Sequence, residues 1–162
     1  VMRDIMKINY GKSLPKDQRI EGDVKVYSSA GNIGQHIEAL TKEPSVIIGR
    51  KGSIGTVYYE INPSFCIDTA YYVSKSDSKT PLIFVYYLLR YLRLDRLNED
   101  SAVPGLNRNT TYSIPILIPS QKFLEKFAEI ANYLYERRTL LLEEQKKLEI
   151  LSQVLTSNLS NP

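Results

Sequence analysis

The stretch VIIGRKGSIGTVYY, residues 46–59, places two adjacent cations on a short glycine-rich turn between two apolar runs. The cations are Arg50 and Lys51, and three glycines flank them. A glycine-rich backbone can approach a ligand closely, and paired cations attract phosphate. A plain β-hairpin is the alternative interpretation, and this stretch by itself leaves both open.

Two further loops have a related composition. YSSAGNIG (27–34) and AVPGLNRNT (102–110) combine glycine with small hydroxyl or amide side chains, and the second also carries an arginine. Such groups, together with exposed backbone N–H groups, position phosphates, while Arg and Asn read guanine and adenine edges in the major groove. Any one of these loops is more often a structural turn. Three of them on one face would form a DNA-reading surface.

Motifs that would indicate catalysis are incomplete. NPSF (62–65) lacks the second proline of the N-P-P-F/Y motif of amino-methyltransferases, and no glycine loop for S-adenosylmethionine accompanies it. GRKGSIG does not have the spacing of a nucleotide P-loop, and AGNIG is too short for a dinucleotide fingerprint. His36 has no obvious Ser or Cys partner, and one histidine with one cysteine cannot form a zinc site. A stand-alone methyltransferase or nuclease is therefore the weaker hypothesis.

Composition indicates a globular protein of the cytoplasm. The 162 residues are 43% hydrophobic and 24% charged, and no apolar run is long enough for a membrane helix or a signal peptide. Cys66, the only cysteine, has apolar neighbours and is expected in the core. The formal net charge is +3, and all of the excess lies in residues 1–120, a mild bias that is compatible with nucleic acid. Most of the twelve tyrosines are expected in strand packing.

Periodicity predicts an α+β fold. The first eighty or so residues consist of β-branched and aromatic runs joined by Gly, Ser and Asn turns, with 24–34 as a short strand entering a small-residue loop. The other clear strands are expected at 46–48, at 56–59 and in TAYYVSK. A helix of about four to five turns is expected to start at Thr80 and Pro81, followed by a loop at 101–112. SIPILIP (113–119) is expected to form a last short strand.

A long helix is predicted from Ser120 to about Ser160, because no Pro or Gly interrupts it. Large apolar side chains recur every seventh residue, at Phe127, Leu134, Leu141, Leu148 and Leu155. Such a stripe must be covered by another helix, and a more polar stripe beside it, with Arg138 and Gln145, would select register and partner. An unbroken helix would span about 60 Å. We therefore expect a break near 132–135, with the first half packed on the globular part and the second half projecting.

The order of these motifs resembles the target recognition domain of type I restriction–modification specificity subunits. The strings that carry the resemblance are VYSSAGNIG, VIIGRKGSIGTVYY, CIDTAYYV, YYLLRYL and SAVPGLNRNTTYSIPILIPS, followed by the long closing helix. They extend from about Gly11 to Leu159. The resemblance implies a mixed α/β globular domain with a curved β-sheet, residues 1–132, and a coiled-coil-type spacer helix, residues 133–162. IPSQKFLEK is a departure, since the family usually has PLEEQ there.

The resemblance also implies the partners. Family members usually carry two recognition domains, each reading half of a bipartite DNA target, and two antiparallel spacer helices. This chain has one of each, so it is expected to be a non-catalytic half-subunit in the bacterial or archaeal cytoplasm. S-adenosylmethionine is expected on a methyltransferase subunit docked on the spacer helix, and ATP and Mg on a restriction motor subunit. No cofactor is expected on this chain. Two copies are expected to pair through residues 134–159, which would make the target an inverted repeat with a gap.

Within that resemblance the polar loops become candidate DNA contacts. Arg50 and Lys51, with Gly52 and Ser53 on the same turn, are expected to meet the DNA backbone or groove. The further candidates are Asn107, Arg108, Ser28, Ser29 and Asn32, and the expected phosphate contacts are Lys12 and Arg19. A helical adaptor whose globular part binds protein rather than DNA is the remaining alternative.

Overall fold

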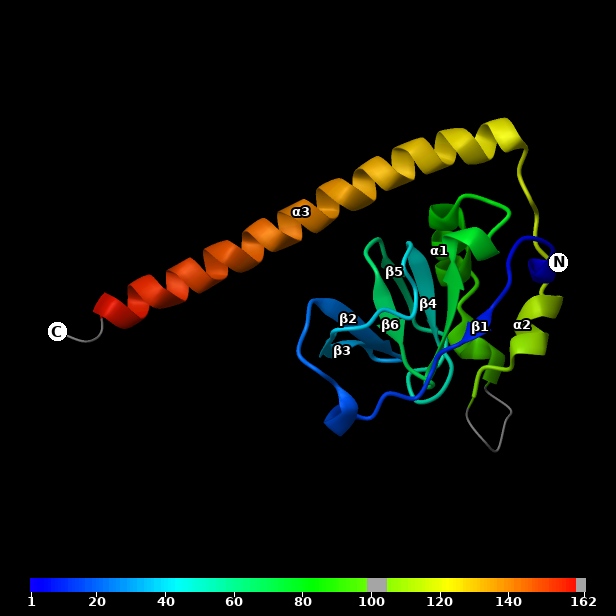
Figure 1. Cartoon of the computed structure of the whole chain (residues 1–162). Coiled ribbons are helices and arrows are strands. Elements are labelled where there is room, and N and C mark those ends of the chain that lie inside the picture. Colours follow the sequence, from blue (N-terminus) through cyan, green and yellow to red (C-terminus); the bar gives the residue numbers. More distant parts are fainter. Residues whose placement is uncertain (99–104, 160–162) are drawn as a thin grey trace.

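The protein consists of a globular part and one long helix that extends away from it (Figure 1). The computed structural model describes residues 1–98 and 105–159. The strands are β1 Asn9–Tyr10, β2 Val24–Ser28, β3 Gly31–His36, β4 Ser45–Gly49, β5 Val57–Glu60, β6 Ser64–Cys66 and β7 Ala70–Ser74. The helices are α1 Leu82–Tyr91, α2 Arg108–Ser113 and α3 Gln121–Leu159, with 3₁₀ turns at Met2–Asp4, Lys16–Gln18, Lys75–Asp77 and Leu94–Asn98. The predicted α+β class is confirmed.

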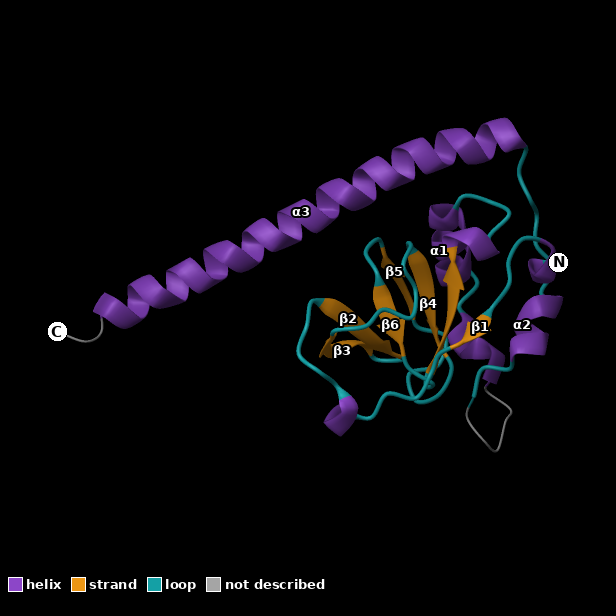
Figure 2. Ribbon diagram, in the orientation of Figure 1, coloured by secondary structure: helices purple, strands orange, loops and turns teal. Residues whose placement is uncertain are grey.

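The strands form two sheets (Figure 2). The larger sheet has the order β1-β7-β4-β5 and is antiparallel, whereas the smaller has the order β3-β2-β6 with β2 and β6 parallel. In β4, Val46 and Ile48 face the main core, while Ile47 faces a smaller cluster with Tyr27 and Cys66. Because both faces of β4 are covered, its sequence is a continuous apolar run rather than an alternating one.

Helix α1 closes the main core. Its buried side chains recur at helical spacing, so one face packs against the larger sheet. These side chains are Leu82, Ile83, Val85, Tyr86 and Leu89. The helix begins at Leu82 with Pro81 as N-cap, one residue later than predicted, and its 10 residues make about three turns rather than four to five. The chain then continues as the 3₁₀ turn Leu94–Asn98.

Helix α3 contacts the globular part through its first half. Leu124 and Ala131 are buried, and the Tyr135 hydroxyl donates a hydrogen bond of 2.7 Å to the Tyr59 carbonyl. The predicted projection of the second half is confirmed, but the predicted break near 132–135 is wrong because the helix is continuous. Kinks arise at Pro, Gly or an inserted group, and this segment has neither Pro nor Gly. The division of the chain at 132/133 stays a prediction.

Two other segments differ from their predictions. SIPILIP forms no strand, because Pro115 and Pro119 lack the N–H groups that a ladder needs, and the Ile114 carbonyl instead accepts from Met2 N at 3.0 Å. Gly31–His36 is a strand although its composition predicts a loop, because pairing with β2 overrides local preference. Cys66 is 1% exposed, which confirms its core position. Among the described residues, no helix is long and apolar enough to cross a membrane.

A buried carboxylate lies at the end of β5. Glu60 accepts hydrogen bonds from Lys25 Nζ and the Tyr27 hydroxyl, both at 2.8 Å, and from the Asn62 backbone N–H at 2.9 Å. Burial by itself would raise the pKa of Glu60, but these donors outweigh it and lower the pKa below its ordinary value. Because the Glu60 side chain is only 4% exposed, the ionised form depends on all three partners.

Replacing Glu60 by Gln should remove part of the acid sensitivity of the fold. The folded pKa lies below the unfolded value, so the carboxylate stabilises the protein above the unfolded pKa and the contribution disappears as the pH falls through the folded pKa. We expect the wild-type free energy of unfolding, measured in urea, to fall more steeply below about pH 4.5 than that of Glu60→Gln. At pH 7 the substitution should cost about 1–3 kcal/mol. The exposed Glu38→Gln is the control, and equal pH slopes for all three proteins would contradict the assignment.

Candidate nucleic-acid interface

Four of the predicted site residues line one hollow, which we call the Tyr10 hollow. Arg50, Lys51, Asn107 and Arg108 line, together with Tyr10, a cavity of about 360 Å³. Its other lining residues are Tyr71, Gly105, Leu106 and Asn109. Segments that lie far apart in the sequence, including the β4–β5 loop and the start of α2, therefore contribute to one surface.

Backbone hydrogen bonds hold these loops together. Leu106 N donates to the Arg50 carbonyl at 2.8 Å, and the Tyr71 hydroxyl donates to the Leu106 carbonyl at 3.0 Å. The N–H groups of Arg50 and Lys51 both donate to the Thr69 carbonyl at 3.0 Å. The positions of the two cations are thus set by the main chain of two other segments, so the loop is organised before any ligand binds.

Two guanidinium groups pack on one tyrosine. The guanidinium carbons of Arg50 and Arg108 lie 4.9 and 4.7 Å from the Tyr10 ring centroid, and that of Arg50 lies 5.6 Å from the Tyr71 centroid. Each also donates to a carbonyl, Arg50 to Asp68 at 3.2 Å and Arg108 to Ile8 at 3.4 Å. Such contacts orient the side chains without neutralising them.

The charge of the hollow is not compensated locally. Within residues 1–98 and 105–159, none of Arg50, Lys51 and Arg108 forms an ion pair with a carboxylate. Arg108 Nε is buried without a hydrogen-bond partner, and Lys51 is exposed. A buried guanidinium N–H without an acceptor is a donor that an anion at this position could satisfy.

Asn107 is exposed, and it also has a structural role. It is the N-cap of α2, and its Oδ1 accepts from the backbone N–H groups of Asn109 and Thr110 at 2.8 and 3.2 Å. The predicted loop at 101–112 therefore contains a short helix, while residues 101–104 lie outside the described part of the chain. Since the amide oxygen is occupied, only the NH₂ group of Asn107 remains for a ligand.

Ser28 and Ser29 support the glycine-rich turn rather than presenting their hydroxyls. They are 7% and 6% exposed, and Ser28 Oγ accepts from Ala30 N at 3.0 Å. The Ser29 carbonyl accepts from the hydroxyl groups of Thr56 and Tyr58. The loop after β2 thus packs directly against the β4–β5 loop, as a shared surface requires.

The remaining predicted residues lie at other positions. Asn32 and Arg19 stabilise the β2–β3 hairpin: Asn32 Oδ1 accepts from Gly34 N, and Arg19 Nη1 donates to the Ile33 carbonyl, both at 3.0 Å. Lys12 is exposed and its N–H donates to the Cys66 carbonyl. Gly52 and Ser53 form the exposed tip of the turn. The role of each in binding stays a prediction.

The sequence did not single out Tyr10 and Tyr71, which form the apolar part of the hollow. Their rings contact edge to face with centroids 5.0 Å apart. The excess of Tyr over Phe and Trp was the available signal, because tyrosine suits a surface that is apolar and wet at once. Composition could not show which two of the twelve would gather here.

Two glycines of the turn have left-handed backbone but different surroundings. Gly55 has a φ of +72°, and a Cβ there would lie 2.2 Å from the Asp95 backbone nitrogen. Gly52 has a φ of +73°, yet a Cβ there would lie 3.5 Å from its nearest neighbour, Ser29 Oγ. Gly55 therefore allows the turn to pack against the 3₁₀ turn after α1, while Gly52 mainly allows the turn itself.

The fold and the hollow define a class of protein: an α+β domain with a cationic, loop-built surface and a projecting helix. The chain belongs to the type I restriction modification DNA specificity domain family, whose model matches residues 2–152. The resemblance seen in the sequence is thereby confirmed.

The fold is also found in a solved structure. The crystal structure of the type I restriction–modification system S subunit from M. genitalium superposes with a TM-score of 0.78 at 23% sequence identity, covering 93% of this chain and 42% of that one. The present chain thus spans less than half of that subunit. Comparison with curated proteins gives no match.

Alanine at Gly55 should destabilise the fold far more than alanine at Gly52. Both substitutions meet the left-handed backbone penalty of about 1–2 kcal/mol. Only Gly55→Ala adds a clash with main chain that cannot be relieved by rotating a side chain, so we expect a total loss of about 3 kcal/mol or more. Urea denaturation of the two variants measures the difference. Similar losses for both would contradict the packing of the turn against Asp95.

Proposed function

We propose that this chain is a non-catalytic DNA-specificity module of a type I restriction–modification enzyme that reads one half of a bipartite target. The observation that carries the proposal is the gathering of Arg50, Lys51 and Arg108 in the Tyr10 hollow, on tightly bonded loops and with no carboxylate partner among the described residues. Cations held in this way suit a DNA backbone and groove, since phosphate contacts set register and guanidinium groups read guanine.

The side chains differ in the role that they suit. Lys51 is exposed at the turn and suits a phosphate, because an ammonium group acts as a point charge. Arg108 is half-buried and held against Tyr10, which suits directional contact with a base edge. The NH₂ group of Asn107 lines the same hollow as a further donor.

The chain would supply recognition, and its partners the chemistry. We assign S-adenosylmethionine to a methyltransferase subunit docked on α3, and ATP and Mg²⁺ to a restriction motor subunit, with no cofactor on this chain. The assembly would act on DNA in the cytoplasm. The exposed apolar residues along α3, described next, support a role of this helix in assembly.

An apolar stripe, interrupted by two charges, runs along α3, and no described residue covers its second half. Successive positions of the stripe are alternately four and three residues apart, and its apolar side chains are each at least 50% exposed. They are Ile130, Leu134, Leu141, Leu148, Leu151 and Leu155. Two charged residues, Arg137 and Glu144, occupy the intervening positions of the same stripe. A heptad stripe of this kind is covered by a second helix, and we propose that a second copy of the chain supplies it.

The charges in the stripe favour an antiparallel pair. A parallel pair in register would place Arg137 against Arg137 and Glu144 against Glu144, which repel. An antiparallel pair with its twofold axis midway between Leu142 and Glu143 places Leu134 level with Leu151 and Ile130 level with Leu155. Glu144 of the other copy then lies level with Leu141, about one helical turn from Arg137. The two charges are close enough for an ion pair, and the twofold axis repeats this pair on its other side.

This pairing would set the spacing of the DNA target. The globular part contacts α3 through Leu124 to Tyr135, so the two contact regions would be centred about 26 residues apart, or roughly 40 Å at 1.5 Å per residue. That is slightly more than one turn of B-DNA. We therefore expect an inverted repeat whose half-sites are centred about one helical turn apart.

The DNA contacts can be separated by two sets of substitutions. Arg50→Ala with Lys51→Ala should weaken binding to all duplex sequences. It should also reduce the slope of log affinity against log salt concentration by the amount that about two phosphate contacts contribute. Arg108→Ala, if Arg108 reads a base, should cost about 1–3 kcal/mol and relax the preference at one position. Fluorescence anisotropy on a randomised duplex, followed by sequencing of the bound fraction, measures both effects.

The exposed Arg96→Ala with Lys146→Ala serves as a control with the same loss of charge outside the hollow. If wild type shows no salt-sensitive duplex binding, the protein-binding adaptor hypothesis is favoured instead. Unchanged affinity in both sets of hollow variants would rule out this position of the interface.

A charge swap tests the pairing of α3. Arg137→Glu should dissociate the pair, since it places two carboxylates together, whereas Arg137→Glu combined with Glu144→Arg should restore it because each swapped charge again meets its opposite. Sedimentation velocity at tens of micromolar measures the association. Lys146→Glu, outside the stripe, should leave the dimer intact. A strict wild-type monomer, or a double swap as dissociated as the single one, would overturn this arrangement.

A further inference from the structure

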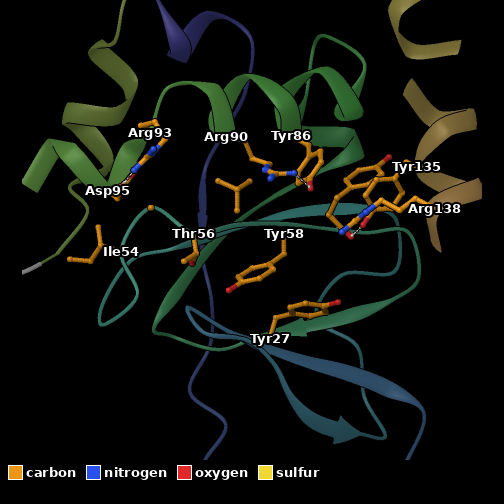
Figure 3. A pocket seen from close by; sticks show the side chains of 13 residues that line it. Tyr27, Ile54, Thr56, Tyr58, Tyr86, Arg90, Arg93, Asp95, Tyr135 and Arg138 are labelled. Atoms are coloured by element: carbon orange, nitrogen blue, oxygen red, sulfur yellow. Dashed lines mark hydrogen bonds and ion pairs between the residues drawn. The ribbon is translucent and has the colours of Figure 1, made fainter. Parts of the chain in front are cut away.

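A second hollow, separate from the Tyr10 hollow, lies between β5, the end of α1 and the part of α3 around Tyr135 (Figure 3). Its volume is about 630 Å³. Five tyrosines line it: Tyr27, Tyr58, Tyr59, Tyr86 and Tyr135. Figure 3 shows the Tyr27 and Tyr58 rings on one side of the space and Tyr86 with Arg90 on the other. We call this space the Tyr58 hollow.

Three arginines line the same space, and two of them have no carboxylate partner among residues 1–98 and 105–159. Arg93 is neutralised by Asp95, with hydrogen bonds of 3.1 and 2.8 Å. Arg90 donates to the Tyr86 hydroxyl at 2.9 Å and lies over that ring, 5.4 Å from its centroid, which orients the guanidinium but leaves its charge. Arg138 forms no ion pair within the described parts of the chain.

The phenols add no negative charge at physiological pH. Burial raises the pKa of Tyr135 to about 12, and burial also raises the pKa values of Tyr27 and Tyr59. Glu60, beneath Tyr27, is already engaged by Lys25. The hollow therefore combines neutral aromatic walls with two guanidinium groups that no carboxylate of the described residues pairs with.

We infer that the Tyr58 hollow binds an unpaired nucleotide, with its base on the Tyr58 ring and its phosphate between Arg90 and Arg138. Aromatic faces beside cations are the combination that holds single-stranded nucleic acid, because every base has a face to stack and every nucleotide a phosphate. An acidic peptide would use the cations but would leave five rings without a matching partner. A paired base cannot supply its face, since that face is stacked within the duplex.

The position of the hollow indicates that the nucleotide would come from the DNA strand bound at the Tyr10 hollow. Ile54, Gly55 and Thr56, on the far side of the same β4–β5 loop that carries Arg50, line the Tyr58 hollow. A DNA strand that meets Arg50 and Lys51 could therefore follow the loop from one hollow to the other. In this respect the inference rests on the proposed DNA-binding function, although the chemistry of the hollow would accept a free nucleotide as well.

Binding of a labelled 12-nucleotide single strand, measured by fluorescence anisotropy with the full chain, tests the inference. Arg90→Gln with Arg138→Gln should weaken single-strand binding at least about tenfold, and Tyr58→Leu at least about fivefold, whereas Tyr58→Phe keeps the ring and should bind nearly as wild type. The matched control, Arg96→Gln with Lys146→Gln, removes the same charge outside the hollow and should have little effect. Displacement of the strand by millimolar dAMP would identify a free nucleotide as a sufficient ligand, and failure of dAMP with success of the strand would identify the strand itself.

The outcomes separate this inference from the proposed function. The nucleotide site alone is overturned if the wild type binds duplex DNA and the hollow variants bind the single strand as tightly as the wild type does. Equal losses in the hollow and control variants would show that net charge suffices, and displacement by poly-glutamate as effectively as by oligonucleotide would show an acidic-peptide site. Absence of any salt-sensitive duplex binding would instead contradict the proposed function.

Discussion

The arrangement of the candidate interface depends on one main-chain contact, the hydrogen bond from Leu106 N to the Arg50 carbonyl. It joins two loops that are more than fifty residues apart, and Tyr71 adds a second bond to the same segment. With both loops tied, Arg50 and Arg108 converge on Tyr10 instead of moving independently in solvent. Convergence matters because a ligand then meets several cations at once without the entropy cost of ordering each loop.

Local placement, rather than overall charge, gives this protein its cationic character. A net charge of +3 on 162 residues creates only a weak long-range field. Both hollows instead combine arginine with tyrosine, whose ring holds a guanidinium group in place by packing and leaves the charge available. The phenolic end can remain near water while the ring packs in the domain, which explains why tyrosine rather than phenylalanine dominates the aromatic residues.

Helix α3 combines two roles along one uninterrupted rod. Its first three turns bury Leu124 and Ala131 against the domain, and Tyr135, one turn further on, fixes its direction. Its later turns carry an apolar stripe that the described domain leaves uncovered, and helices in proteins gain most of their stability from packing of such an apolar face. The two charges within that stripe, Arg137 and Glu144, tie the stability of the helix to the orientation of whatever covers it.

Much of the candidate site could be predicted because the relevant signals are local. Glycines beside Arg50 and Lys51 indicate a turn, the heptads predict α3, and the apolar run of β4 predicts a buried strand. The strand Gly31–His36 could not be predicted, since its pairing with β2 outweighs a loop-like composition. The buried positions of Ser28 and Ser29 likewise depend on a neighbouring loop.

The sequence alone thus determined the α+β class, the family resemblance, the cationic turn and the long helix, because each depends on the types and spacing of residues along the chain. Only the tertiary structure decided that Arg50 and Arg108 share Tyr10, and that α3 passes Tyr135 without a break. It also decided that five tyrosines and three arginines enclose a second hollow in the described domain. Contacts between distant segments depend on how the sheets and helices pack, and no local pattern in a single chain specifies that packing.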